Sequence, residues 1–343
     1  MDKTVIFAVA GSGKTRSIVD RIDPSRRSLV LTYTTNTEAD LRQRIEERLG
    51  EHSATVTVDT YFSFLNRFCY KPFLQAEMRS RGISFSAPSE ESRGMSLPNN
   101  LRYMHGDRIY HCRMAKLLEE KGYLPALRDR LDRYYDDVYV DEVQDFGGYD
   151  FDFLLKISCA QARFLLVGDF YQHTFSTSHD GGINRSLHKD YDKYRQRFAK
   201  AGFHVDTSTL KGSHRCGPAI CNHIVNTLGI QITAEGKSTA RVEVVGSQAE
   251  ADRLHSDPAI VKLFLQQHWL YGCHSHNWGS CKGLDHYQDV CVVLNPSSWT
   301  LFTQGKLAQA KPRTRNRLYV AFSRARGNLY IAPEKLFKKH LAT

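Results

Sequence analysis

The pattern of apolar and polar residues alternates between short apolar runs and longer segments in which apolar residues recur at helical spacing. Helical spacing is present in residues 36–49, between residues 108 and 131, and in the charged stretch 182–202. Short apolar runs in the first part of the chain predict buried strands at residues 4–7, 28–33, 54–58, 138–140 and 164–169. Because strands alternate with helices, we expect a parallel sheet with helices on both faces.

The same alternation continues in a second half that begins near Phe203. It predicts strands at 241–245, 290–294 and 329–331, and helices at 218–228, 248–267 and 315–325. Between residues 71 and 106 the periodicity is weak, which predicts a short irregular insertion with a short helix around 74–81. A length of 343 residues is natural for two domains. We therefore expect an α/β protein with domains 1–202 and 203–343.

Composition excludes several classes of protein. The apolar fraction of 41% is ordinary for a globular chain, and no run approaches the roughly 18 apolar residues of a membrane span. The eight cysteines are scattered without a Cys-x-x-Cys pair, and the chain opens on a strand rather than a signal peptide. We therefore expect a cytoplasmic protein with free thiols and no membrane partner.

Positive charge is concentrated near one end of the chain. The net charge is +10, and residues 301–343 contain ten Lys and Arg residues against one acidic residue, Glu334, so this stretch carries +9. Such a surface is typical of a protein that binds a polyanion. A solvated basic face is the other interpretation, and charge alone does not separate the two.

Residues 8–15 (Ala-Val-Ala-Gly-Ser-Gly-Lys-Thr) follow the first predicted strand and precede a helical stretch. This order is typical of a phosphate-binding loop, in which small residues let backbone N–H groups point at phosphate oxygens. The following helix N-terminus adds partial positive charge. Lys14 can reach the β- and γ-phosphates, and the Thr15 hydroxyl can bind Mg²⁺.

An acidic pair, Asp141 and Glu142, follows the strand at 138–140. A carboxylate at this strand end can bind Mg²⁺ beside a phosphate loop, and its neighbour can deprotonate an attacking water. The alternative is that both are surface acids that cap the next helix. A second cluster, Cys273, His274, His276 and Cys281, could bind zinc, although its spacing matches no common zinc module.

Taken in order, these motifs resemble those of the UvrD/Rep branch of the superfamily 1 helicases. The phosphate loop and residues 141–145 (Asp-Glu-Val-Gln-Asp) match that family's most specific motifs. Further matches are 32–36, 57–61, 168–172 (Gly-Asp-Phe-Tyr-Gln), 213–215, 280–285 and 319–326 (Tyr-Val-Ala-Phe-Ser-Arg-Ala-Arg). The match therefore extends over most of the chain.

The resemblance implies two RecA-like domains that bind ATP and Mg²⁺ in the cleft between them. It assigns catalytic roles to Lys14, Glu142, Gln172, Arg215 and Arg324, the two arginines being candidate arginine fingers. It assigns metal binding to Thr15 and Asp141. Nucleotide contacts are expected from Ala10, Gly11, Ser12, Gly13, Lys14, Thr15, Arg16, His214, Gly283 and Asp285.

The resemblance also implies a track for single-stranded DNA across both domains, with 3′→5′ polarity. Tyr33 matches an aromatic residue that stacks on bases, and Thr32, Thr60 and Tyr61 lie in segments that line the track. Packing of Tyr33 in the core is the alternative. Phe175 and Trp278 are weaker candidates, and an RNA substrate remains open because stacking and backbone contacts do not exclude the 2′-OH.

The chain departs from the family in its size. It leaves no room for large insertions in either domain or for the upstream Gln that reads adenine. The leading interpretation is an ATP-dependent single-stranded DNA translocase or helicase. The alternative is a DNA-stimulated ATPase switch that regulates a partner such as a nuclease, as in small relatives like the helicase subunit of Gabija phage-defence systems. A third interpretation, a nucleic-acid-binding module with a decayed ATPase, conflicts with the intact Lys14 and Glu142.

Overall fold

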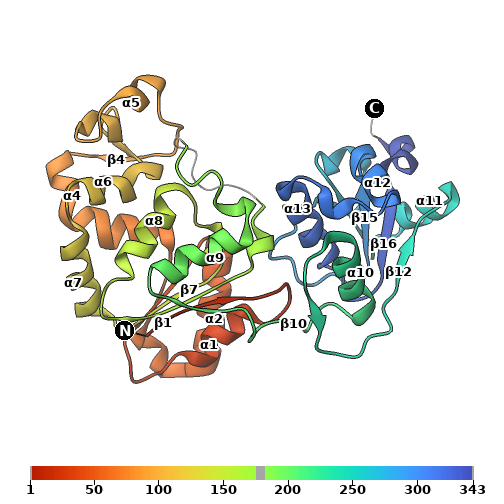
Figure 1. The fold of residues 1–343 in the computed structure, drawn as a ribbon, viewed down its shortest axis with the longest axis horizontal. Coiled ribbons are helices and arrows are strands. Elements are labelled where there is room, and N and C mark those ends of the chain that lie inside the picture. Colours follow the sequence, from red (N-terminus) through yellow and green to blue (C-terminus); the bar gives the residue numbers. More distant parts are fainter. Residues whose placement is uncertain (1, 175–181, 342–343) are drawn as a thin grey trace. The chain divides into compact units, whose positions relative to one another are not determined.

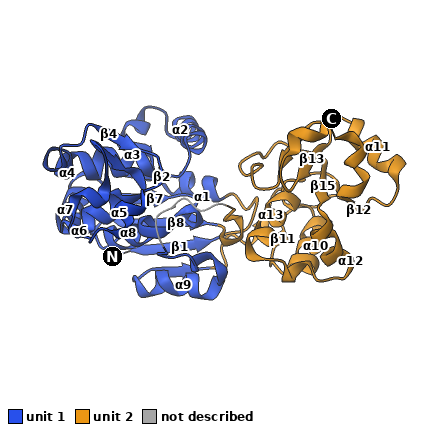
Figure 2. Cartoon of the chain, turned by 90° about the horizontal axis from the view of Figure 1, so that it is seen from above, with its two compact units in different colours: residues 1–7, 14–168, 176–206 blue, residues 8–13, 169–175, 207–343 orange. Residues whose placement is uncertain are grey.

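The computed structural model describes residues 2–174 and 182–341 (Figure 1). The chain divides into two compact units (Figure 2). Unit 1 comprises Met1–Phe7, Lys14–Gly168 and Ser176–Asp206, and unit 2 comprises Ala8–Gly13, Asp169–Phe175 and Thr207–Thr343. Two short segments that the sequence places in the first domain therefore pack with unit 2.

Unit 1 is built on a six-stranded parallel sheet of order β3-β2-β7-β8-β1-β9. Its strands are β1 (Lys3–Phe7), β2 (Ser28–Thr32), β3 (Val56–Thr60), β7 (Asp137–Val140), β8 (Arg163–Gly168) and β9 (His204–Asp206). Most of their side chains are buried on both faces, which is why these strands appear in the sequence as nearly continuous apolar runs. The edge strand β9 has no such run and was not predicted.

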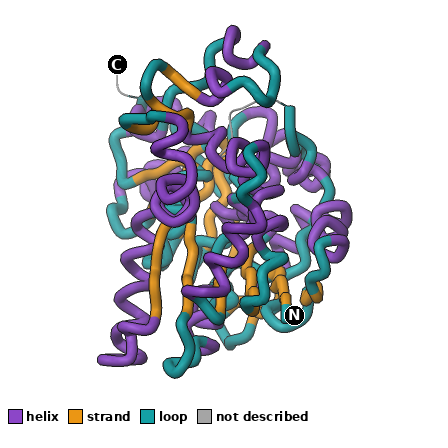
Figure 3. Tube along the Cα trace, turned by 90° about the vertical axis from the view of Figure 1, so that its left-hand side faces the viewer, coloured by secondary structure: helices purple, strands orange, loops and turns teal. Residues whose placement is uncertain are grey.

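Helices cover both faces of this sheet, as the tube in Figure 3 shows with unit 1 toward the viewer. They are α1 (Lys14–Arg21), α2 (Thr35–Leu49), α3 (Tyr61–Phe64), α6 (Met114–Glu120), α7 (Leu124–Tyr134), α8 (Gly148–Ile157) and α9 (Tyr191–Lys200). Phe7 of β1 packs against Tyr194 and Phe198 of α9 on one face. Ile6, its neighbour along the strand, faces the side of Arg21 in α1, because successive strand residues point to opposite faces.

The insertion at residues 71–106 has more regular structure than its weak periodicity predicts. It contains α4 (Lys71–Met78), β4 (Gly82–Ser84), α5 (Glu90–Gly94) and β5 (Met104–His105), and β4 and β5 pair with β6 (Arg108–Tyr110). Its polar composition is accommodated by hydrogen bonds. The guanidinium of Arg113 is fully buried and donates to the hydroxyl of Ser92 across 3.1 Å.

Unit 2 contains a five-stranded parallel sheet of order β12-β16-β15-β13-β14. The strands are β12 (Val242–Val244), β13 (Val261–Phe264), β14 (Ser275–Asn277), β15 (Val290–Leu294) and β16 (Leu329–Pro333). The helices are α10 (Pro218–Leu228), α11 (Gln248–Ser256), α12 (Pro296–Thr303) and α13 (Pro312–Phe322). A separate two-stranded ladder joins β10 (Gly212–Ser213) and β11 (Thr233–Ala234).

One predicted element of unit 2 is wrong. The sequence predicts a helix over 248–267, but α11 ends at Ser256 and is followed by β13, whose four residues are all buried. Pro258 cannot continue a helix because it lacks an N–H group. The apolar run after it therefore enters the centre of the sheet.

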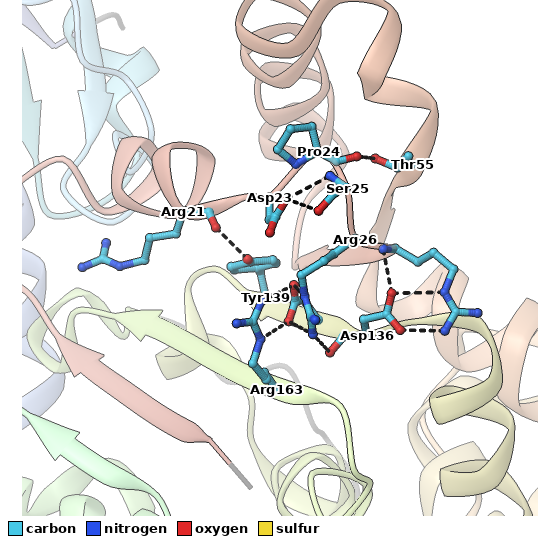
Figure 4. Close-up of polar contacts among 11 residues, drawn as sticks. Arg21, Asp23, Pro24, Ser25, Arg26, Thr55, Asp136, Tyr139 and Arg163 are labelled. Carbon is cyan, nitrogen blue, oxygen red and sulfur yellow. Dashed lines mark hydrogen bonds and ion pairs between the residues drawn. The ribbon is translucent and has the colours of Figure 1, made fainter.

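An ion-pair cluster lies at the start of β7 in unit 1 (Figure 4). Asp137 is buried and accepts hydrogen bonds from the guanidinium groups of Arg26 and Arg163, with a distance of 2.8 Å to Arg26 Nε. Arg27 holds the pKa of its partner Asp136 down at about 2. These residues lie at the opposite end of β7 from Asp141. Two of them, Asp137 and Arg163, also line a pocket of about 340 Å³. The cluster therefore ties β7 to its neighbours without reaching the phosphate loop.

Among the residues that the structure describes, no helix combines the length and the apolar character needed to cross a lipid bilayer.

Candidate active site

The phosphate loop connects β1, which ends at Phe7, with α1, which begins at Lys14. Gly11 and Gly13 have φ angles of 71° and 81°, in the left-handed region that favours glycine. A Cβ atom on Gly11 would also lie 2.7 Å from both the Ser213 hydroxyl and the Arg215 Cβ. Gly11 is therefore required both by its backbone conformation and by the close approach of residues 213–215.

A buried tyrosine holds this loop within unit 2. The N–H of Ala10 donates to the Tyr319 hydroxyl across 2.8 Å, and that hydroxyl donates to Asp169 Oδ2 across 3.0 Å. Gln172 Nε2 donates to the same carboxylate oxygen across 2.9 Å. One side chain of α13 therefore links the loop to the 168–172 motif, a role that the sequence resemblance does not assign to Tyr319.

The predicted acidic pair lies where β7 ends in unit 1. Asp141 is buried, and its Oδ2 accepts a hydrogen bond of 2.9 Å from the Thr15 hydroxyl. Burial and, to a smaller extent, the nearby Glu142 carboxylate raise the pKa of Asp141 to about 6, a shift that Lys14 and the Thr15 hydrogen bond partly oppose. The structure thus brings together Lys14, Thr15, Asp141 and Glu142 as the sequence predicts.

Glu142 has an unusual backbone conformation. Its φ and ψ of 55° and 43° are left-handed, which is uncommon for a residue other than glycine and is often found at functional sites. Gln144 donates a hydrogen bond from its amide to the Glu142 carboxylate. A Cβ on Gly168 would lie 2.4 Å from Gln144 Oε1, so the end of β8 packs closely against this turn.

The two predicted arginine fingers share one carboxylate in unit 2. Arg215 Nη2 lies 2.5 Å from Asp285 Oδ2, and Arg324 Nη1 lies 2.8 Å from Asp285 Oδ1. The arginine side chains are 9% and 2% exposed, whereas that of Asp285 is 50% exposed. Burial lowers the pKa of Arg215, and repulsion from Arg324 lowers it further.

The other predicted nucleotide contacts have varied environments. Ser12 is buried, and its hydroxyl donates to the Val9 carbonyl across 2.9 Å. The side chain of His214 is exposed, and its backbone N–H donates to the Gly11 carbonyl across 2.9 Å. Arg16 is exposed and pairs with Asp20, and Gly283 has a left-handed φ of 83°. Their contacts with nucleotide stay predictions.

Of the four predicted nucleic-acid residues, Tyr33 alone is partly exposed, while Thr32, Thr60 and Tyr61 are buried. The rings of Tyr33 and Tyr61 are stacked with centroids 6.4 Å apart. The Tyr61 hydroxyl donates to Asp150 across 3.1 Å, and burial raises the pKa of Asp150 to about 7. A nucleic-acid contact stays a prediction for all four, and the structure favours support of the Tyr33 ring as the role of Tyr61.

The weaker candidates divide between the core and the undescribed part of the chain. Trp278 is fully buried, and its indole N–H donates to the Leu263 carbonyl across 2.9 Å, so the surface role considered for it is wrong. Phe175 lies outside the described residues. The Cys281 thiol is buried against the Trp278 carbonyl, and the described residues contain no cluster of three or more side chains suited to a metal ion.

Two family models match the chain. The model described as the UvrD/REP helicase N-terminal domain matches residues 1–107, and the viral superfamily 1 RNA helicase core domain matches residues 115–332. The chain belongs to the superfamily 1 helicases. This confirms the resemblance and the expectation of an α/β fold with parallel sheets.

Among solved structures, the chain is similar to the Arterivirus nonstructural protein 10 helicase in complex with DNA, at 16% identity and a TM-score of 0.49. It is also similar to the PRRSV helicase, at 14% identity and a TM-score of 0.48. These alignments cover 98% and 99% of this chain but 63% and 54% of those helicases, so this chain spans less than two thirds of their length. No curated protein sequence matches it.

Proposed function

We propose that this chain is an ATP-dependent translocase or helicase that couples hydrolysis of Mg-ATP to 3′→5′ movement on single-stranded DNA. The observation that carries the proposal is the hydrogen bond between Thr15 and buried Asp141, with Glu142 beside them. In a superfamily 1 helicase this is the arrangement expected where Mg-ATP is hydrolysed.

The donor set suits Mg²⁺. The Thr15 hydroxyl and the Asp141 carboxylate are hard oxygen ligands, which this ion prefers, and they lie 2.9 Å apart. When bound, Mg²⁺ would neutralise phosphate charge that develops during hydrolysis. The backbone N–H groups of residues 11–13 and the Lys14 ammonium would hold the phosphates themselves.

Glu142 is the proposed general base. It would take a proton from the water that attacks the γ-phosphorus, while the Gln144 amide orients its carboxylate. Arg215 and Arg324 would stabilise negative charge in the transition state because guanidinium groups stay charged and bind phosphate oxygens in a fixed geometry. Both arginines pair with Asp285 in this structure. We propose that phosphate oxygens take the place of this carboxylate when ATP binds.

DNA binding is proposed to involve Tyr33. Its partly exposed ring is supported by Tyr61 and by Phe146, whose ring centroid lies 5.7 Å away. Stacking on such a ring is worth about 1–3 kcal/mol per base and tolerates any sequence, as a translocating motor requires. Replacing Tyr33 with Ala should therefore weaken binding to oligo(dT) without changing hydrolysis in the absence of DNA.

A second candidate function is a DNA-stimulated switch that controls a protein partner such as a nuclease. Exposed apolar side chains in the insertion favour it, since Phe85 and Leu101 are 67% and 62% exposed. A strand-displacement assay distinguishes the candidates. A helicase separates duplex by itself, whereas the switch hydrolyses ATP on DNA without separating strands.

Steady-state ATP hydrolysis tests the proposal, measured without nucleic acid and with single-stranded DNA, duplex DNA or RNA. Strong stimulation by single-stranded DNA is expected, and Glu142→Gln should abolish it because the amide cannot accept the proton. Glu47→Gln on the exposed face of α2 is the matched control and should behave as wild type. Hydrolysis that is insensitive to nucleic acid would argue against a motor.

A further inference from the structure

A guanidinium group on α7 is held between two aromatic rings without an acidic partner. The guanidinium carbon of Arg130 lies 4.7 Å from the centroid of the Phe68 ring and 5.0 Å from that of Tyr134. Its Nε atom is buried and lacks a hydrogen-bond partner in the described part of the chain, where Arg130 forms no ion pair either. The two rings therefore fix the direction of this cation and leave its charge to be paired by an anion from outside.

The ring of Phe68 has a rigid support. It belongs to Leu65–Tyr70, a π-helical segment, and this rare conformation is frequent at functional sites. The ring stacks on that of Phe64, which is buried, with centroids 5.2 Å apart, and lies 5.7 Å from the ring of Tyr135. Arg130 is thus presented near the surface of unit 1 on a fixed aromatic base.

An unpaired acidic residue precedes Arg130 on the same helix. Asp129 is exposed and forms neither a hydrogen bond nor an ion pair through its side chain within residues 2–174 and 182–341. It does not pair with Arg130 of its own chain, because successive helix residues point about 100° apart and do not face each other. One unpaired anion and one unpaired cation therefore lie side by side on α7.

These charges belong to an outward stripe of α7, which we call the α7 stripe. The exposed residues of the helix recur at helical spacing and are Pro125, Ala126, Asp129, Arg133 and Tyr134, with the partly exposed Arg130 among them. Leu127 and Leu131 are buried on the opposite side of the helix. Figures 1 and 2 both place α7 at the margin of unit 1. The stripe is therefore open to a partner.

The α7 stripe is complementary to itself when two copies run antiparallel. A two-fold axis between positions 129 and 130 places Asp129 of each copy opposite Arg130 of the other. The same axis places Ala126 opposite Arg133, so that a small residue faces a long one. Residues 125 and 134 then also meet, and a proline ring packs against a tyrosine ring. Charge, size and ring contacts thus agree on one register.

We propose that the α7 stripe is a homodimerisation surface, on which a second copy of this chain binds antiparallel and forms two Asp129–Arg130 ion pairs. A contact of this kind uses the same patch on both copies, as two-fold symmetry requires. Two short helices bury little area, so association should be weak and reversible. The end of α7 that carries the stripe's cations leads into the start of β7, whereas Asp141 follows the far end of that strand. The dimer surface is therefore separate from the predicted catalytic residues.

Analytical ultracentrifugation of the full chain, without nucleotide or DNA, tests this surface. Wild type should sediment as a monomer–dimer equilibrium. Asp129→Arg should raise the dissociation constant by about tenfold or more, because it turns two attractions into two repulsions, and Arg130→Asp should do the same. Glu46→Arg is the matched control, since it makes the same change of charge at an exposed site on α2, and it should dimerise as wild type does.

Mixing the two variants gives the sharpest result. Asp129→Arg and Arg130→Asp should each be monomeric alone and should form a heterodimer together, because each pair across the axis again joins opposite charges. If Arg130→Asp folds poorly after losing its ring contacts, Ala126→Arg replaces it. That exposed substitution places an arginine opposite Arg133 of the other copy and should also weaken the dimer.

Three results would overturn the inference. A wild type that stays monomeric up to its solubility limit would leave the α7 stripe to a different protein or to solvent. A dimer that Asp129→Arg weakens no more than Glu46→Arg does would form through another surface. A mixture of well-folded variants that stays monomeric would show that the two residues do not face each other. The inference does not depend on the proposed function, since association is measured without ATP or DNA.

Discussion

Removing a single hydroxyl group, by Tyr319→Phe, should destabilise unit 2 although the ring and its packing are kept. The hydroxyl accepts from the Ala10 N–H at 2.8 Å and donates to Asp169 at 3.0 Å, and both Ala10 and Tyr319 are fully buried. A buried N–H left without a partner costs about 1–3 kcal/mol, and a hydrogen bond to a carboxylate contributes about 1.5–3 kcal/mol. Asp169 retains Gln172 as a donor, which offsets part of the second loss. We therefore expect a loss of about 3 kcal/mol in the free energy of unfolding.

Tyr287→Phe is the matched control in the same unit. The Tyr287 hydroxyl is buried and has no hydrogen-bond partner in the described part of the chain. Its removal should leave stability unchanged or slightly raised, because a polar group without a partner is costly to bury.

Urea unfolding of both full-length variants, followed by circular dichroism, gives the comparison. Tyr319→Phe should lower the midpoint of a transition, and it should raise KM for ATP more than it lowers kcat because Ala10 belongs to the phosphate loop. If the two variants unfold at the same urea concentration, the link from Tyr319 to the loop does not contribute to stability, and this reasoning is refuted.

Asp285→Asn should lower stability by about 2 kcal/mol because two buried guanidiniums lose their shared carboxylate, and added ATP should restore more stability in the variant than in wild type. If ATP raises the melting temperature of the variant and of wild type equally, this expectation is contradicted. Burial lowers the pKa of His223 to about 4 from 6.5, so the neutral side chain contributes stability above pH 6.5 that is lost as pH falls, by about 3 kcal/mol. His223→Phe should remove this loss, and urea midpoints that still fall in parallel with wild type would exclude His223 as its source. Burial raises the pKa of Asp150 from 3.8 to about 7. The protonated carboxyl therefore contributes stability that is fully present below pH 3.8 and is lost as pH rises through 7, by about 4 kcal/mol. Asp150→Asn should flatten that decline, and a variant as sensitive as wild type between pH 5 and 8 would show that another group titrates.

Features that depend on neighbouring residues could be predicted from the sequence. The phosphate loop and the acidic pair each combine a strand with the residues directly after it, so their local pattern carries the information. The pairing of Thr15 with Asp141 was expected because the phosphate loop and the acidic motif resemble those of the superfamily 1 helicases, in which both bind Mg²⁺. The strand β13 was missed because its apolar run, Val261–Phe264, follows a helix after a short turn and has no alternation of its own.

Features that depend on distant contacts could not be predicted. The bond between Ala10 and Tyr319 joins residues 309 positions apart, and no local pattern marks it. The burial of Tyr61 and Trp278 likewise depends on the elements that cover them. Aromatic residues suit both a protein core and a base-stacking surface, so composition alone did not decide between those roles.

The central claim, movement along single-stranded DNA powered by ATP, is tested most directly by displacement of streptavidin from biotin-labelled oligonucleotides. With biotin at the 5′ end, a 3′→5′ translocase should displace streptavidin when ATP is supplied, and Glu142→Gln should not. With biotin at the 3′ end, displacement should stay at the level seen without ATP. Stimulated ATP hydrolysis with no displacement from either end would contradict the claim and support a switch, and displacement from the 3′ end would reverse the proposed polarity.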